Sequence, residues 1–108
     1  MRSTVNKDEY EMMVMNLITN SGQSKSEAMS AIHHAKQGDF AACDLAFEAC
    51  SEFIKRAHDV QTSLIGLDEG EGKVPVTLVM VHAQDHLMNA MLMRDLAKEI
   101  VDLHRRLA

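Results

Sequence analysis

The most regular pattern of apolar positions in the chain runs from residue 40 to residue 64. Its members are spaced alternately by three and four residues, which places them on one face of a helix. They are Phe40, Cys43, Phe47, Cys50, Ile54, Ala57, Gln61 and Leu64. The pattern predicts a long amphipathic helix with a heptad-like seam, ending near Leu67.

A weaker apolar stripe precedes this helix and predicts another one. It begins with Tyr10, Met13 and Leu17 and resumes after residue 27 with mostly small side chains. Because a glycine inside a helix costs about 1 kcal/mol relative to alanine, we expect a kink or a local break near Gly22. The helix is expected to start near residue 7 or 8, with Asn6 as a possible cap.

Two residues mark the passage from the first predicted helix to the second. Gly38 follows the first stripe and suits the C-terminal cap of a helix, where a left-handed backbone favours glycine. Asp39 comes next and can cap the N-terminus of the following helix. The first helix should therefore end at Gln37-Gly38, and the second should begin immediately afterwards.

A third helix is predicted after a glycine-rich acidic loop at residues 68–73. Pro75 suits its first turn, and the helical pattern extends to about Arg106. At a rotation of about 100° per residue, one side of this helix carries a row of apolar residues that a single acid interrupts. The residues in this row are Leu78, Asp85, Leu92, Leu96 and Leu103. A buried carboxylate in such a row is costly unless it is paired or bound to a metal, which marks Asp85 as a functional candidate.

The composition is that of an all-α protein. Alanine, leucine and methionine dominate, and the chain has no tryptophan and one proline. We therefore predict one domain, residues 1–108, with three long antiparallel helices in an up-down-up bundle. Such a bundle has a thin core, and the apolar surface of its third helix is unusually wide. These features predict self-association through a coiled-coil-like contact between copies.

Charge and cysteine usage narrow the class further. With 16 acidic and 11 basic side chains, the chain has a formal net charge of −5, which argues against binding to nucleic acid or to an anionic membrane. The apolar run from Val74 to Val81 is too short to span a bilayer, and the N-terminal residues lack a signal-peptide core. We expect a cytoplasmic protein in which Cys43 and Cys50 are small core residues rather than a disulfide.

The most distinctive chemistry lies on the third predicted helix. His82, Asp85 and His86 project together, because residues three and four apart share a helix face. His82 can be a core histidine, a metal ligand or a nucleophile, and its spacing from His86 is that of helical zinc pairs, although no third ligand is evident. In an oligomer, several copies of Asp85 could meet around a hard cation such as Mg²⁺. A protonated or hydrogen-bonded buried aspartate is the alternative.

A second polar cluster lies on the second predicted helix. Gln61 occupies a position in the apolar seam, and His58 and Thr62 flank it. A polar residue in a seam often only sets register or partner choice. Here it could also orient a histidine or donate a hydrogen bond to a phosphoryl group.

Four stretches of the chain resemble a known family. The sequence is similar to the enzyme IIA component of the lactose/cellobiose (and diacetylchitobiose) class of the bacterial sugar phosphotransferase system. Matching runs extend over nearly the whole chain in the family's order, and the last stretch is the most specific. The stretches are Asn20-Ser21-Gly22, Gln37-Gly38-Asp39-Phe40, Ala57-His58-Asp59-Val60-Gln61-Thr62 with Leu64-Ile65, and Val81-His82-Ala83-Gln84-Asp85-His86-Leu87-Met88.

The resemblance implies an assembly and a chemistry. The assembly is a homotrimer of three-helix protomers, in which Asp85 of each copy meets around one metal ion, Mg²⁺, and no organic cofactor is needed. The phosphocarrier protein HPr would phosphorylate Nε2 of His82, and the group would pass to a cysteine of enzyme IIB. The relay would serve uptake of a β-linked disaccharide, of the cellobiose/diacetylchitobiose type or lactose, through a membrane component.

Side chains near His82 would then support the phosphoryl group. The candidate hydrogen-bond donors are Gln61, Thr62, Gln84 and His86, with His58 beside them. The alternative is a metal-binding or structural helical oligomer that uses His82, His86 and Asp85.

Overall fold

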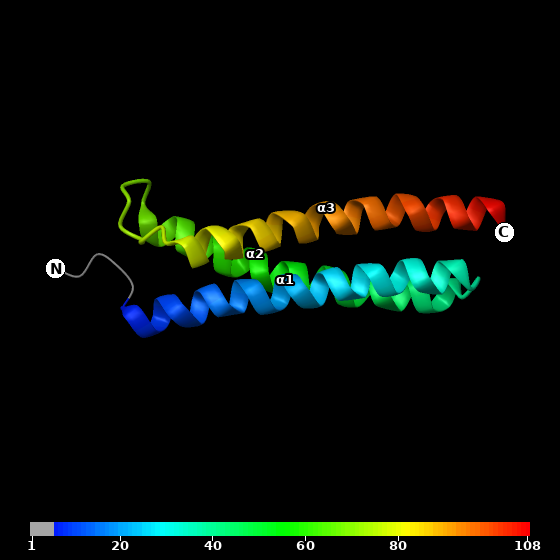
Figure 1. Cartoon of the computed structure of the whole chain (residues 1–108), viewed down its shortest axis with the longest axis horizontal. Helices are drawn as coiled ribbons and strands as arrows, with labels where there is room; N and C mark the ends of the chain where they lie inside the picture. The colour runs from blue at the N-terminus through cyan, green and yellow to red at the C-terminus, as the bar shows by residue number, and fades with distance from the viewer. Residues whose placement is uncertain (1–5) are drawn as a thin grey trace.

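Three long helices make up the part of the chain that the structure describes, residues 6–108 of a computed structural model. They are α1 (Lys7–Lys36), α2 (Phe40–Asp68) and α3 (Leu78–Leu107). They run in alternating directions along a rod of 61 × 20 × 20 Å, so that α1 and α3 begin at the same end (Figure 1). Residues 6–108 contain no strand, and the predicted all-α, three-helix architecture is confirmed. In this same range no helix is long and apolar enough to cross a bilayer.

The helix ends follow local signals in the sequence, as predicted. The side chain of Asn6 accepts the backbone N–H of Glu9 at 2.8 Å, and the Glu9 carboxylate accepts the N–H of Asn6 in return, which is a capping box. The α1 helix ends just before Gly38, whose φ of +76° favours glycine. Asp39 then caps α2 by accepting the N–H of Ala42 at 3.1 Å.

The α1 helix continues without interruption through Gly22, so the prediction of a break there is wrong. Tertiary packing explains the difference, because the neighbouring Ser21 and Ser24 are fully buried rather than solvated. The hydroxyl of Ser24 lies 3.2 Å from Sγ of Cys50 on α2. Burial of this small-residue face thus outweighs the weak helix propensity of the segment.

Replacing Gly22 by alanine is expected to stabilise the protein by about 0.5–1 kcal/mol, because the helical glycine only adds entropy to the unfolded chain. A Cβ atom at this position would meet nothing within 4 Å. The midpoint of urea denaturation measures the change. The matched substitution Gly38→Ala, in the left-handed region, should lower the midpoint instead. A lower midpoint for Gly22→Ala would contradict the unstrained continuous helix.

Pro75 lies outside α3, so the prediction that it occupies the first turn is wrong. The helix begins at Leu78, and the hydroxyl of Thr77 caps it by accepting the N–H of Met80 at 3.3 Å. The Tyr10 hydroxyl donates to the carbonyl of Pro75 at 2.9 Å, which leaves Thr77 to donate to Tyr10 at 2.8 Å. These contacts with α1 hold residues 75–77 outside the helix, and the backbone of Thr77 is extended.

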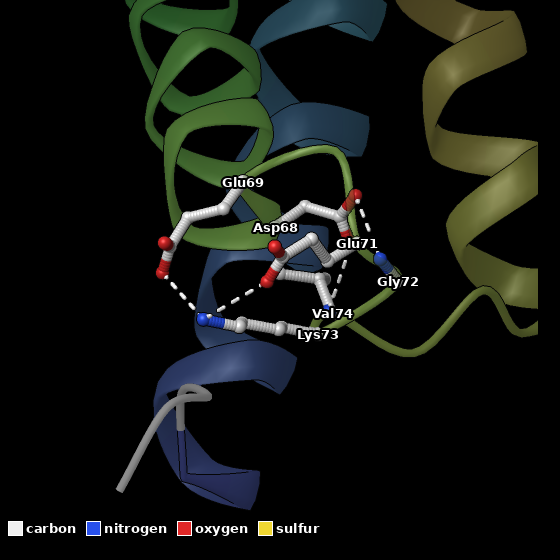
Figure 2. Close-up of polar contacts among 6 residues, drawn as sticks. All are labelled: Asp68, Glu69, Glu71, Gly72, Lys73 and Val74. Atoms are coloured by element: carbon white, nitrogen blue, oxygen red, sulfur yellow. Dashed lines mark hydrogen bonds and ion pairs between the residues drawn. The ribbon is translucent and has the colours of Figure 1, made fainter.

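The glycine-rich acidic loop is a hydrogen-bonded turn built around the last residue of α2 (Figure 2). One carboxylate oxygen of Asp68 accepts the N–H of Val74 at 2.9 Å, and the other accepts that of Gly72 at 3.3 Å. The ammonium of Lys73 lies 2.9 and 3.4 Å from carboxylate oxygens of two glutamates in the turn. The turn thereby fixes the path from α2 to α3.

The α3 helix has a buried face of small residues and an exposed apolar face. The buried residues are Met80, Ala83, Leu87, Ala90, Ala97 and Val101. We call the opposite side, centred on the leucine row and Asp85, the outer face of α3. The leucines of the row, Leu78, Leu92, Leu96 and Leu103, are between 53 and 87% exposed. The acid therefore interrupts an apolar surface that a single copy leaves uncovered.

The two cysteines are core residues, as predicted. Cys43 and Cys50 are fully buried on the face of α2 that packs against α1. The thiol of Cys43 donates to the carbonyl oxygen of Ala31 at 3.1 Å. The α1 helix packs along both of the others, whereas α2 and α3 contact each other much less.

Candidate functional site

Two histidines one turn apart on α3 form the centre of the candidate site. The Nε2 atoms of His82 and His86 are 3.0 Å apart, and the rings meet edge to face with centroids 4.4 Å apart. His82 is exposed, whereas His86 is half-buried towards α1. The spacing of four residues brings the two rings together on one side of the helix.

The surroundings of the His86 ring favour its neutral form. Burial is the main cause that lowers its pKa, and the nearby charges of His82 and Lys25 lower it further, while Asp85 acts in the opposite direction. A neutral imidazole carries one proton, so only one of its nitrogens can donate a hydrogen bond.

The surroundings of His86 decide which nitrogen carries that proton. Its Nδ1 atom is buried and has no hydrogen-bond partner among the described residues. Placing the proton there would bury an N–H without an acceptor, which is costly. The proton therefore belongs on Nε2, from which it is donated to Nε2 of His82. In this arrangement Nε2 of His82 is the hydrogen-bond acceptor.

The glutamines of the predicted site lie on another side of α3. Gln84 is two residues from His82, which separates the two side chains by about 200° around the helix. Nε2 of Gln61 on α2 donates to Oε1 of Gln84 at 2.6 Å. Within one chain, Gln84 thus lies on the side of α3 that faces α2, whereas His82 and His86 lie on the side towards α1.

The other sequence candidates are exposed. His58 and Thr62 lie on the surface of α2 on either side of Gln61, and no hydrogen bond in residues 6–108 joins them to His82. Asp85 is exposed on the outer face of α3. One chain therefore brings His82 to His86 and Gln61 to Gln84, and holds these two pairs apart.

A groove of about 420 Å³ runs between α1 and α3 and begins at Asn89, about one helical turn after His86. Its lining is mostly apolar, with Lys25 and Asn89 as the polar members. The apolar members are Met29, Ile32, Leu92, Met93, Leu96, Ala97 and Ile100. Lys25 is absent from the sequence-based candidates, because only the pairing of α1 with α3 places it beside this site.

The described chain offers no complete metal site by itself. Among residues 6–108, no group of three or more His, Cys, Asp and Glu side chains could hold a metal ion. The pair His82 and His86 could supply two nitrogens, and Asp85 could supply oxygen. An ion bound by the outer face would therefore need ligands from further copies.

The fold and the site define an all-helical protein that presents an exposed histidine in contact with a second one. The family described as "PTS system, Lactose/Cellobiose specific IIA subunit" matches residues 12–105. The N,N'-diacetylchitobiose-specific EIIA component of Escherichia coli strain K12 is 52% identical over 100 residues, which are 93% of this chain and 86% of that protein.

Solved structures agree with this sequence match. The cellobiose-specific enzyme IIA of Bacillus anthracis superposes with a TM-score of 0.87 at 39% identity, covering 99% of this chain and 96% of that one. The chitobiose IIA of Escherichia coli, solved in complex with HPr, gives a TM-score of 0.80 at 51% identity, with coverages of 91% and 95%.

The chain belongs to the lactose/cellobiose-specific IIA family of the sugar phosphotransferase system. It is therefore a component of a phosphotransferase relay, of the cellobiose and chitobiose type. The family resemblance read from the four sequence stretches is confirmed.

Proposed function

We propose that this chain carries a phosphoryl group on Nε2 of His82, which it accepts from HPr and passes to a cysteine of enzyme IIB. The observation that carries the proposal is the exposed His82 ring, whose Nε2 atom lies 3.0 Å from Nε2 of His86. The HPr complex of the chitobiose relative supports HPr as the donor. The relay would act in the cytoplasm and serve uptake of a β-linked disaccharide.

The side chains define the transfer chemistry. The lone pair of Nε2 on His82 attacks phosphorus, the new P–N bond forms as the bond to the donor breaks, and the ring proton stays on Nδ1. The N–H of His86 loses its acceptor in this step and becomes free to donate to a phosphoryl oxygen. Transfer to a thiolate of enzyme IIB reverses these steps at His82.

Incubation of the protein with enzyme I, HPr and phosphoenolpyruvate tests the proposal. We expect an acid-labile, base-stable adduct that peptide mapping places on His82. Absence of the adduct, or its location on another of the six histidines, would refute the assignment.

We also propose that the protein is a homotrimer that covers the outer face of α3. The exposed leucine row supports self-association, because apolar surface of this extent is uncommon on a protein that works as a monomer. Rotational symmetry would bring the flank of α3 that carries His82 in one copy towards the flank that carries Gln84 in its neighbour. Gln61, Thr62, Gln84 and His58 could then support the phosphoryl group of a neighbouring chain.

Asp85 fits the Mg²⁺ site that we include in this proposal. It is the one acidic residue in the leucine row, and a carboxylate oxygen is the ligand that hard cations prefer. One carboxylate per copy would surround an ion on the symmetry axis, where it would offset the repulsion between like charges. The ion has a structural role here, and phosphoryl transfer needs no step at the metal.

The variant Asp85→Leu is expected to keep the assembly and to lose bound Mg²⁺, since replacing a buried ionic cluster by apolar residues is often neutral or stabilising. Sedimentation gives the oligomeric state, and elemental analysis after dialysis gives the metal content. Asp95→Leu, an exposed acid on the same helix, should leave both unchanged. Equal metal content in wild type and Asp85→Leu would exclude Asp85 as a ligand.

A further inference from the structure

Lys25 is a half-buried lysine of α1 that lacks a partner. Within residues 6–108 it has no carboxylate within ion-pair distance and no hydrogen bond. Some other basic side chains are paired, as Lys55 is with Asp59 and Arg105 with Asp44, whereas lysines without an ion pair, such as Lys36 and Lys98, are exposed. Because a lysine is seldom buried without compensation, an unpaired one in an apolar groove suggests that its anionic partner arrives later.

The geometry of α1 and α3 aims this side chain at the histidine pair. Lys25 and Asn89 line the same groove, and Asn89 shares a side of α3 with His82 and His86, seven and three residues away. Both helices start at the end where Tyr10 contacts Thr77, so they run in the same direction. Side chains lean towards the N-terminus of their helix. The Lys25 side chain starts beside Asn89 and therefore extends along α3 towards His86.

We propose that the ammonium of Lys25 is an electrostatic positioning group for the phosphoryl group on His82. The inference rests on the proposed phosphorylation of His82 and adds a residue that the chemistry of the histidines does not require. Phosphorylation places a charge of about −1.5 to −2 on the ring. The chain already has a net charge of −5, so a local positive charge beside His82 stabilises the phosphorylated state.

A purely structural role fits the surroundings less well. The groove is lined mainly by methionine, leucine and isoleucine, against which an uncharged side chain of similar length would pack as well as the aliphatic stem of a lysine. A positive charge is useful there only if an anion is nearby during part of the cycle. The phosphoryl group is the anion that the proposed function brings to this side of α3.

The equilibrium of phosphoryl exchange with HPr tests the proposal. Lys25→Gln and Lys25→Met should each lower the equilibrium constant for phosphoryl transfer from HPr by about 3- to 10-fold. The phosphorylated fraction of the protein at equilibrium falls accordingly. Lys25→Arg should restore most of the loss, because it keeps the charge. Lys55→Gln removes an exposed lysine elsewhere and is the matched control, which should change the constant little.

Salt dependence separates a charge effect from a packing effect. If Lys25 acts through its charge, the difference between wild type and Lys25→Gln should shrink as ionic strength rises from about 0.05 to 0.5 M. An equilibrium constant that is the same in wild type, Lys25→Gln and Lys25→Met overturns the proposal. So does an equal shift in Lys55→Gln, or a difference that salt does not change. Failure of wild type to be phosphorylated on His82 would instead refute the proposed function itself.

Discussion

The variant His82→Ala is expected to lose phosphoryl uptake from HPr, by at least about 1,000-fold in rate, while its helical bundle stays intact. In the proposed function His82 provides the attacking nitrogen, and none of the other five histidines offers an exposed ring held against a second imidazole. The side chain is exposed and contributes little to the core, so stability should change by less than about 0.5 kcal/mol. Phosphoryl incorporation with time measures the first effect, and thermal unfolding followed by circular dichroism measures the second.

Two companion variants sharpen this result. His33→Ala removes an exposed histidine of α1 and should be phosphorylated like wild type. His86→Ala keeps the nucleophile but removes the N–H that faces it, so it should be phosphorylated slowly rather than not at all. Full incorporation in His82→Ala would show that another residue carries the group.

The second large effect is expected at the outer face of α3. Leu92→Glu and Leu96→Glu should each weaken self-association by at least about 100-fold, because each buries a charge where a leucine side chain was buried between copies. Both leucines are more than half exposed in one chain, so the fold of the protomer should survive. Analytical ultracentrifugation over a range of concentrations measures the association.

Leu45 provides the matched control for this experiment. It is an exposed leucine of α2, 68% accessible, and lies outside the outer face of α3. Leu45→Glu should therefore leave the oligomeric state unchanged. A wild-type protein that sediments as a monomer, or variants at Leu92 and Leu96 that associate as strongly as wild type, would refute the proposed assembly.

The parts of the fold that could be predicted are those specified by near neighbours in the sequence. The caps at Asn6 and Asp39 and the helix end at Gly38 depend on contacts three or four residues apart, and all three are confirmed. The exclusion of Pro75 from α3 could not be predicted in this way, although Thr77 caps the helix through a local contact. The exclusion depends on the hydroxyl of Tyr10, which lies 65 residues before Pro75. The predicted break at Gly22 is wrong for a related reason, because burial of its neighbours on α1 outweighs the low helix propensity of glycine.

In the candidate site, too, contacts within one helix could be predicted and contacts between helices could not. The contact between His82 and His86 follows from a spacing of four on one helix, and the structure contains it. The bond between Gln61 and Gln84 requires the register of α2 against α3, and the position of Lys25 requires that of α1 against α3. Neither register can be read from periodicity alone, so the sequence could not separate the glutamine side of α3 from the histidine side.

The hydrogen bond between the two imidazoles also makes the resting protein selective about what it reacts with. While the N–H of His86 occupies the lone pair on His82, an electrophile must first break a contact worth about 1 kcal/mol, which slows reaction about fivefold. A phosphoryl group more than recovers that cost, because its charged oxygens accept the released N–H more strongly than a neutral imidazole does. An alkylating or acylating reagent without such oxygens does not. We therefore expect the ring pair to favour a phosphoryl donor over alkylating or acylating reagents of similar electrophilic reactivity.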